Sequence, residues 1–155
     1  MKRLSISLAA AALLVWPAAA QPSYPGTAIG KWWVNGADGA CTAGAGYDGA
    51  HIIFVSADGN NEGVIFLTGD RVTNSMGDGS SLRLTIDGVA VTGEGSISDA
   101  PRGYFVSYGM TSQMARLRDN PRFVLTKSGK PVFDVTLTDV SRVIGELLRC
   151  DAMVS

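Results

Sequence analysis

Five Asp-Gly pairs punctuate the 155-residue chain and separate its short apolar runs from one another. They fall at positions 38–39, 48–49, 58–59, 78–79 and 87–88. Asp followed by Gly accepts the left-handed backbone of tight turns, and a Gly-rich chain of short apolar runs favours strands over a helical bundle. The pattern therefore predicts a mainly β, antiparallel β-sandwich-like domain.

Three hairpins are predicted from apolar runs that flank turn residues. The runs 51–56 and 64–68 pair across 58–61, 82–86 pairs with 89–92 across Asp87-Gly88, and 123–126 pairs with 132–137 across 127–130. Residues 31–35 and 104–108 are further strand candidates. By contrast, we expect an extended lead-in over 21–30, an irregular Gly/Ala-rich segment over 35–49 and a polar, turn-rich segment over 69–80.

Helical spacing occurs twice, both times near the end of the chain. One apolar stripe follows Asp139, a potential N-cap, and predicts a C-terminal helix; its members are Val140, Val143, Ile144, Leu147 and Leu148. Met110, Met114 and Leu117 predict one short helix that begins at Thr111 or Ser112 and ends before Pro121.

Cys41 and Cys150 are the only cysteines. In an oxidising compartment an even pair is most simply a disulfide, and there is no C-x-x-C that would favour a reactive thiol pair. Cys150 lies about 280° around the predicted helix from Val140, close to the apolar stripe, so its thiol should face the protein. In the chain-entropy model a bridge across a loop of about 100 residues is worth roughly 4.7 kcal/mol.

The first 20 residues have the three parts of a secretory signal peptide. A positive Met1-Lys2-Arg3 precedes an apolar run to Trp16, and 18–20 is Ala-Ala-Ala. An uncleaved N-terminal anchor is the alternative, although the run is short for a span of about 20 residues. Cleavage would leave one exported β-rich domain, 21–155, without a stable membrane span, and we expect a periplasmic or secreted protein.

Charge is distributed unevenly over that domain. Residues 21–100 hold three basic and nine acidic residues, whereas 101–155 hold eight basic and five acidic ones. This balance does not suggest nucleic acid as a partner. A basic stretch and two tryptophans could instead form the surface for an envelope protein partner; its members are Trp32, Trp33, Arg116, Arg118, Arg122, Lys127 and Lys130. Since Trp32 and Trp33 are adjacent, a strand would bury one and expose the other.

No motif specifies catalysis, a cofactor or a metal. His51 is the only histidine and begins an apolar strand, so a locally bonded histidine is favoured over a catalytic triad or zinc site. Residues 58–63 begin like a calcium-binding loop, but the twelfth position is Gly69 rather than an acid. A carboxylate pair stays open, with Glu62, Glu94, Asp87 and Asp134 as candidates. We expect Glu146 on the outer face of its helix.

Three features resemble one known family. They are the Gly30-Lys31-Trp32 opening with Cys41 soon after, the hairpin over 123–137, and the helix end Leu147-Leu148-Arg149-Cys150. The chain resembles small exported proteobacterial proteins of the invasion-associated locus B type. That resemblance implies a secreted β-sandwich with no established catalytic residues. Such proteins often carry a further cysteine where this chain has Gly36, so the cross-linking differs and a role in host invasion is not carried over.

Three functions remain open from the sequence. The favoured one is a non-enzymatic periplasmic or secreted binding or accessory module that acts through a protein surface. A small envelope hydrolase that uses an Asp/Glu pair is the first alternative, and its carboxylates should converge in a cleft with shifted pKa values. An inhibitor or immunity protein is the second, and it should hold one tight protein partner.

Overall fold

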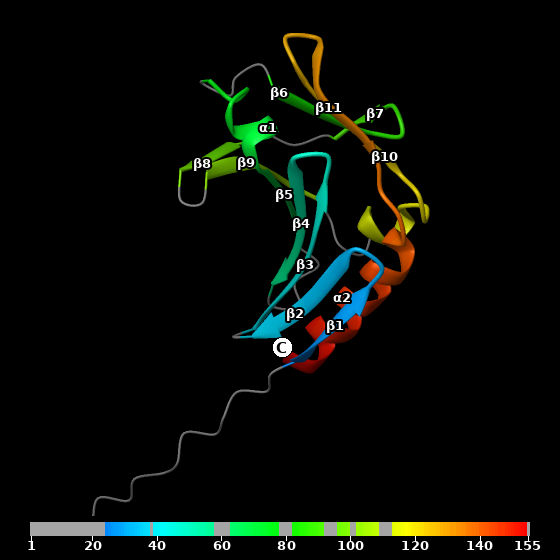
Figure 1. Ribbon diagram of the computed structural model, residues 1–155. Helices are drawn as coiled ribbons and strands as arrows, with labels where there is room; N and C mark the ends of the chain where they lie inside the picture. Colours follow the sequence, from blue (N-terminus) through cyan, green and yellow to red (C-terminus); the bar gives the residue numbers. More distant parts are fainter. Residues whose placement is uncertain are drawn as a thin grey trace, which may run out of the picture.

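The computed structural model describes residues 24–37, 39–57, 63–77, 82–91, 96–99, 102–108 and 113–154. The predicted signal peptide and the predicted turn at 58–61 lie outside the described residues. Within them the chain is mainly β, with two antiparallel sheets, as predicted. The larger sheet has the order β1-β2-β3-β4-β5-β9-β8, and the smaller has β11-β10-β6-β7 (Figure 1).

The strand bounds follow the apolar runs closely in most places. The larger sheet contains β1 (Tyr24–Ile29), β2 (Trp32–Ala37), β3 (Ala40–Tyr47), β4 (Ala50–Ala57), β5 (Gly63–Thr68), β8 (Ser96–Asp99) and β9 (Arg102–Ser107). The smaller contains β6 (Leu82–Ile86), β7 (Val89–Ala90), β10 (Arg122–Lys127) and β11 (Lys130–Thr136). All three predicted hairpins pair antiparallel.

Three hairpin turns show why Asp-Gly and Ser-Gly sit where they do. Asp48-Gly49, Asp87-Gly88 and Ser128-Gly129 each have positive φ at both residues, between 46° and 81°. Two consecutive left-handed residues make the type I′ turn whose twist matches paired strands. The Asp-Gly signal for strand reversal is therefore confirmed at 48–49 and 87–88.

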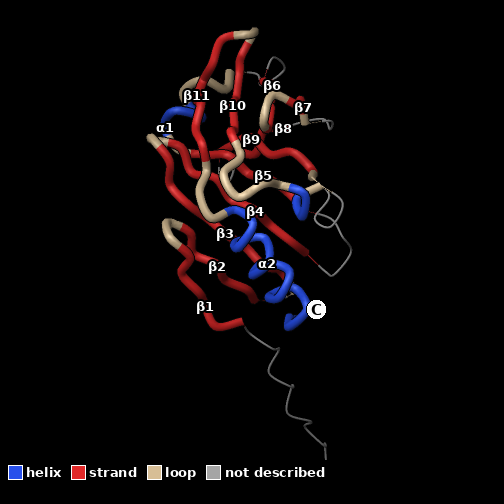
Figure 2. Tube along the Cα trace, turned by 90° about the vertical axis from the view of Figure 1, so that its right-hand side faces the viewer, coloured by secondary structure: helices blue, strands red, loops and turns tan. Residues whose placement is uncertain are grey.

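One face of the larger sheet is covered by two different elements. The C-terminal helix α2 (Val140–Val154) packs on β1 to β4, and Figure 2 shows it lying across these strands. The smaller sheet covers the remainder, with Phe54 of β4 meeting Phe123 of β10 at 6.2 Å between ring centroids. A single apolar core joins the two halves. The predicted helix and sandwich-like arrangement are both confirmed.

The segment predicted to be irregular is a central strand instead. Along β3 the buried residues alternate as Cys41, Ala43, Ala45 and Tyr47. The alternation is not visible in the sequence, because the buried side chains are small and do not stand out as apolar. Small side chains also allow a helix to approach the sheet closely. The lead-in is likewise ordered as strand β1, paired with β2.

Two helical turns differ from expectation. The predicted helix around Met114 is a single 3₁₀ turn, η1 (Met114–Arg116), because Leu117 already has extended backbone at ψ 130°. Met114 is buried and Leu117 half-buried, so the predicted apolar residues do anchor this turn; Met110 lies outside the described residues. The turn-rich segment contains one helical turn, α1 (Asp70–Thr73), which buries Val72.

Candidate functional site

The outer face of the larger sheet carries a continuous apolar row. Strand pairing places Trp33 opposite Gly44, Gly44 opposite Ile53, Ile53 opposite Phe66 and Phe66 opposite Phe105. The row thus crosses five neighbouring strands, β2, β3, β4, β5 and β9. A second pair, Val55 with Val64, lies beside it on the same face. We call this surface the apolar platform; its members are Trp33, Ile53, Val55, Val64, Phe66 and Phe105.

Two of the three aromatic rings of the platform pack against glycines. The indole of Trp33 covers Gly26 of β1, where a Cβ atom would lie 2.8 Å from Trp33 Cε2. The ring of Phe66 covers Gly103 of β9 in the same way, at 2.6 Å from Cε2. Aromatic rings that pack over strand glycines are held in one orientation. The platform is therefore broad and already ordered.

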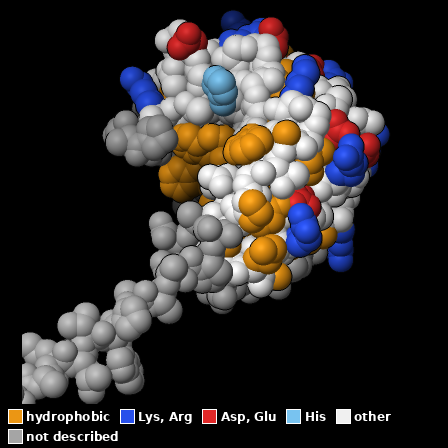
Figure 3. Space-filling model, turned by 60° about the horizontal axis from the view of Figure 1, so that its bottom comes forward, with side chains coloured by type: hydrophobic (Ala, Val, Ile, Leu, Met, Phe, Trp, Pro, Cys, Tyr) orange, Lys and Arg blue, Asp and Glu red, His pale blue; other side chains and the backbone are white. Residues whose placement is uncertain are grey.

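Polar residues surround this apolar centre. Trp33 is 56% exposed, whereas the five other platform side chains are half-buried. His51, Asn35 and Thr42 are exposed on the same outer face, by the alternation of their strands. Figure 3 shows hydrophobic side chains gathered in patches on this side of the molecule, below the single histidine. An apolar centre with a polar border is the usual anatomy of a protein–protein interface.

Trp32 is not part of any surface, which corrects the prediction that included it. Its side chain is 1% exposed, it stacks on Phe54 at 5.1 Å, and its Nε1–H donates to the Thr138 carbonyl at 2.8 Å. The Tyr47 hydroxyl accepts from Thr138 N–H at 3.1 Å. Both contacts fix the chain just before α2. The expectation that one tryptophan is buried and one exposed is confirmed.

The basic stretch does not form one patch. Arg118 binds Asp87 at 2.5 Å and Arg122 binds Asp134 through two hydrogen bonds. Lys127 and Lys130 lie opposite each other at the far end of the β10–β11 hairpin, about five residues or roughly 17 Å from Arg122. Arg116 lies on η1, two residues before Arg118. Ion pairing and strand length thus divide a cluster that is contiguous in sequence.

The candidate carboxylates are engaged by cations. The hydrogen bond from Arg122 N–H, and then Arg118, lower the pKa of Asp87, and the Arg122 side chain lowers the pKa of Asp134. A general acid needs a raised pKa, so these directions are opposite to that role. Glu62 and Glu94 lie outside the described residues.

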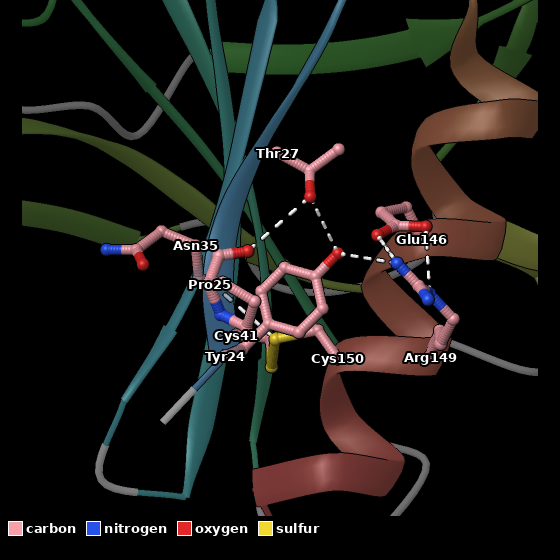
Figure 4. Close-up of polar contacts among 8 residues, drawn as sticks. All are labelled: Tyr24, Pro25, Thr27, Asn35, Cys41, Glu146, Arg149 and Cys150. Atoms are coloured by element: carbon pink, nitrogen blue, oxygen red, sulfur yellow. Dashed lines mark hydrogen bonds and ion pairs between the residues drawn. A yellow bond between two sulfur atoms is a disulfide. The ribbon is translucent and has the colours of Figure 1, made fainter. Parts of the chain in front are cut away.

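Glu146 is not on the outer face of its helix, contrary to expectation. Its side chain is only 16% exposed because Arg149 closes over it with two hydrogen bonds, of 2.5 and 3.1 Å (Figure 4). Arg149 also donates to the Tyr24 hydroxyl at 3.3 Å. By helix geometry Glu146 lies about 40° from Cys150, at the edge of the buried stripe. This cluster ties β1 to α2.

The predicted disulfide is present beside that cluster. Cys41 and Cys150 are both fully buried and bonded, with 6.1 Å between their Cα atoms. Gly36 of β2 lies directly against the bridge: a Cβ atom there would lie 2.9 Å from Cys41 Sγ and nearer still to Cys150 Sγ. A side chain at position 36 would therefore clash with the bridge.

His51 and the other possible metal ligands stay dispersed. His51 is exposed at the start of β4, next to Gly46 and Gly69. No three side chains of His, Cys, Asp or Glu come together to hold a metal ion in the part of the chain that is described. None of the described helices is long and apolar enough to cross a membrane.

Sequence reasoning missed the platform, although a signal for it exists. In the runs 51–56 and 64–68, apolar residues occupy both the odd and even positions. A strand that is apolar on both sides is typical of a sheet covered on both faces. Only the inner face of the larger sheet is covered by the described elements, so the run itself indicates a second apolar surface.

Comparison with known proteins adds no relative. No protein-family model, no curated protein and no solved structure matches the chain.

Proposed function

We propose that this protein is a non-enzymatic binding module of the bacterial envelope or exterior, and that its apolar platform binds another envelope protein. The observation that carries the proposal is the row from Trp33 to Phe105 across five paired strands. Large exposed apolar patches mark interaction sites. The buried Cys41–Cys150 bridge supports an oxidising location, periplasmic or secreted.

The chemistry of the platform favours a protein partner over other ligands. Its centre is aliphatic, with Ile53, Val55 and Val64, and its aromatic rings lie at the sides. Rings fixed over glycine lose little side-chain entropy on binding, which raises affinity without new contacts. A nucleic acid would need a basic surface, and the Lys and Arg side chains of the basic stretch are divided by ion pairs and distance.

The opposite surface provides an internal control. On the outer face of the smaller sheet, the polar residues Arg83, Thr85 and Thr126 lie around one half-buried valine, Val124, which pairs with Thr85. Thr85 is half-buried like Val55, so the two positions match in exposure but differ in their surroundings. A surface that binds through its apolar character should distinguish them.

Photocrosslinking from the two positions tests the proposal. A photoreactive phenylalanine replaces Val55 or Thr85 in the full chain, expressed with its own N-terminus, and adducts are identified by mass spectrometry. We expect one discrete heterologous adduct from position 55 and none from 85. Val64→Lys should remove that adduct, and the purified partner should bind the wild-type chain but not Val64→Lys. Equal adducts from both positions, no adduct, or an adduct between two copies of this chain would each overturn the proposal.

A further inference from the structure

Strand β7 is an edge strand of the smaller sheet, and no further strand pairs with it among the residues that the structure describes. Val89 lies opposite the buried Ile86, so its side chain shares the inner face, yet it is 70% exposed. Val91 continues along this face and donates its N–H to the Leu84 carbonyl at 2.9 Å. Together with Leu117, these residues line a pocket of about 500 Å³. This volume is in the range of pockets that take small molecules.

The polar groups at this pocket leave an uncompensated positive charge. Asp87 also lines it, but Arg118 and the Arg122 N–H already bind its carboxylate, at 2.5 and 2.9 Å. Arg116 lines the pocket as well, and it has no hydrogen-bond or ion-pair partner among the described residues. Among the described residues, two arginine side chains, Arg116 and Arg118, therefore accompany one carboxylate, that of Asp87.

A neutral donor lies in the same wall. Burial, and secondly the charge of Asp87, raise the pKa of Tyr108. Its hydroxyl consequently stays protonated at neutral pH and is able to donate a hydrogen bond. Tyr108 and Arg116 thus present donors beside aliphatic side chains. The polar residues Asp87 and Gln113 also line the pocket.

We propose that this edge pocket binds a small amphiphilic anion, a medium-chain carboxylate, with its alkyl chain on Val89, Val91 and Leu117 and its carboxylate on Arg116. Charge complementarity selects the anion over a neutral chain, because Arg116 gains a partner that the protein does not supply. The pocket and the apolar platform are separate surfaces, one on the inner face of the smaller sheet and one on the outer face of the larger sheet. The outcome for one does not decide the other.

Titration with octanoate and octanol tests the site directly. The full, disulfide-bonded chain is followed by calorimetry and by the methyl NMR signals of Val89 and Val91. We expect one octanoate per chain, with shifts at both valines. Arg116→Gln should weaken octanoate binding roughly tenfold and leave octanol binding unchanged, as expected for the loss of one charge-assisted hydrogen bond. Arg83→Gln, which removes an exposed arginine from the outer face of the same sheet, is the matched control and should change neither ligand.

A second variant separates the pocket from a general charge effect. Val89→Asp places an acid in a wall that is largely exposed, so the fold should persist, and it should remove binding of both ligands. The proposal fails if octanoate produces no saturable shift at Val89 and Val91, or if Arg116→Gln and Arg83→Gln weaken binding equally. It also fails if the shifts appear at the methyl groups of Ile53 and Val55, because the ligand would then lie on the platform.

Discussion

The two halves of the larger sheet's inner face are covered in contrasting ways. Under α2, the sheet presents small residues, Gly36, Ala43 and Ala45, beside the disulfide. Under the smaller sheet it presents bulky ones, and Phe54 meets Phe123 there. Small residues let a helix approach closely but bury little apolar area, and burial stabilises by roughly 25 cal/mol per Å². The half under α2 is therefore stabilised mainly by a few specific contacts. The half under the smaller sheet is stabilised mainly by the burial of large apolar side chains.

The specific contacts of the helical half are of three kinds. The disulfide joins β3 to α2, the Arg149–Glu146 pair with Tyr24 joins β1 to α2, and Trp32 with Tyr47 holds Thr138 before the helix begins. Each of these contacts depends on one or two side chains. This half should consequently respond sharply to single changes that leave apolar volume almost intact.

The largest expected effect is the loss of the bridge. Cys41→Ala combined with Cys150→Ala should lower the free energy of unfolding by about 4 kcal/mol, since the bridge closes a loop of 109 residues. Urea denaturation measures this change in the free energy of unfolding for the whole domain. Hydrogen exchange should show that amides of α2 and β1 lose more protection than those of β10, because the bridge holds only the helical half.

Phe123→Ala is the matched change in the other half. It should cost about 3–4 kcal/mol through lost burial and a residual cavity. Its hydrogen-exchange effect should centre on β10 and β4 rather than on α2. Identical protection patterns from the two variants would show that the halves unfold as one unit, and the contrast between them would then have no energetic meaning.

A smaller effect is expected at the glycine under the bridge. Gly36→Ala should cost about 1–3 kcal/mol, since the added methyl group overlaps both sulfur atoms. In the chain without cysteines the same change should cost less than half as much, because only the contact with Tyr24 Cβ, at 3.1 Å, remains. Gly44→Ala is the control: its Cβ would meet Ile53 at an ordinary 3.7 Å, so stability should hardly change.

The wild type, Gly36→Ala, the variant without cysteines and their combination form a double-mutant cycle. Denaturation of these four chains gives the coupling free energy between the methyl group at position 36 and the bridge. An additive cycle would mean that Gly36 is required for a reason other than the disulfide. A coupling of 1 kcal/mol or more, as expected for groups in contact, would assign the requirement to the two sulfur atoms.

The sequence predicts those parts of the fold in which the buried side chains are large and apolar or the turns have a typical sequence. The hairpins around Asp87-Gly88 and at 123–137, the stripe of α2 and the bridge were all predicted, because turn chemistry and apolar spacing are local signals. Strand β3 was not, since Ala43 and Ala45 carry no bulk although they are buried. Glu146 is shielded by Arg149, three residues further along the helix, and Arg149 in turn donates to Tyr24, 125 residues away in sequence. The apolar stripe of the helix shows neither contact.

The candidate surface shows the same division. Exposure of one tryptophan followed from alternation, but its partners in the platform follow from strand order, which places β9 beside β5. The basic stretch is contiguous in sequence but divided in space. The extended strand β10 separates Arg122 from Lys127, Arg122 pairs with Asp134 on β11, and Arg118 pairs with Asp87 in the turn between β6 and β7. Proximity in sequence therefore predicted a basic patch that the structure divides. The apolar platform, in contrast, is defined by the register between neighbouring strands.

The smallest expected effect is on the acid dependence of the half under the smaller sheet. Arg122 N–H and Arg118 lower the pKa of folded Asp87. A lowered pKa means that the stabilisation is complete above the unfolded value, near 4, and is lost as the pH falls through the folded value. Asp87→Asn should therefore lose less stability than the wild type between pH 7 and pH 3. Urea midpoints at both pH values measure this difference.

Asp134→Asn provides the comparison, because its pKa is lowered by the Arg122 side chain on the same sheet. Both variants should be less acid-sensitive than the wild type at β10, while α2 keeps its covalent link at either pH. If the α2 amides of the wild type lost protection in acid before those of β10, the helical half would be the more acid-sensitive one, contrary to this prediction.

The position of the bridge also sets an order of events during synthesis. The ribosome makes Cys41 109 residues before Cys150, and the sequence holds no other thiol with which either could pair within the chain. Throughout that interval Cys41 is unpaired, although it belongs to the central strand of the larger sheet. Strands β1 to β5 are therefore synthesised before any covalent link is able to hold them. The bridge joins the early strand β3 to α2, the last helix made, so it links the two ends of the folding domain.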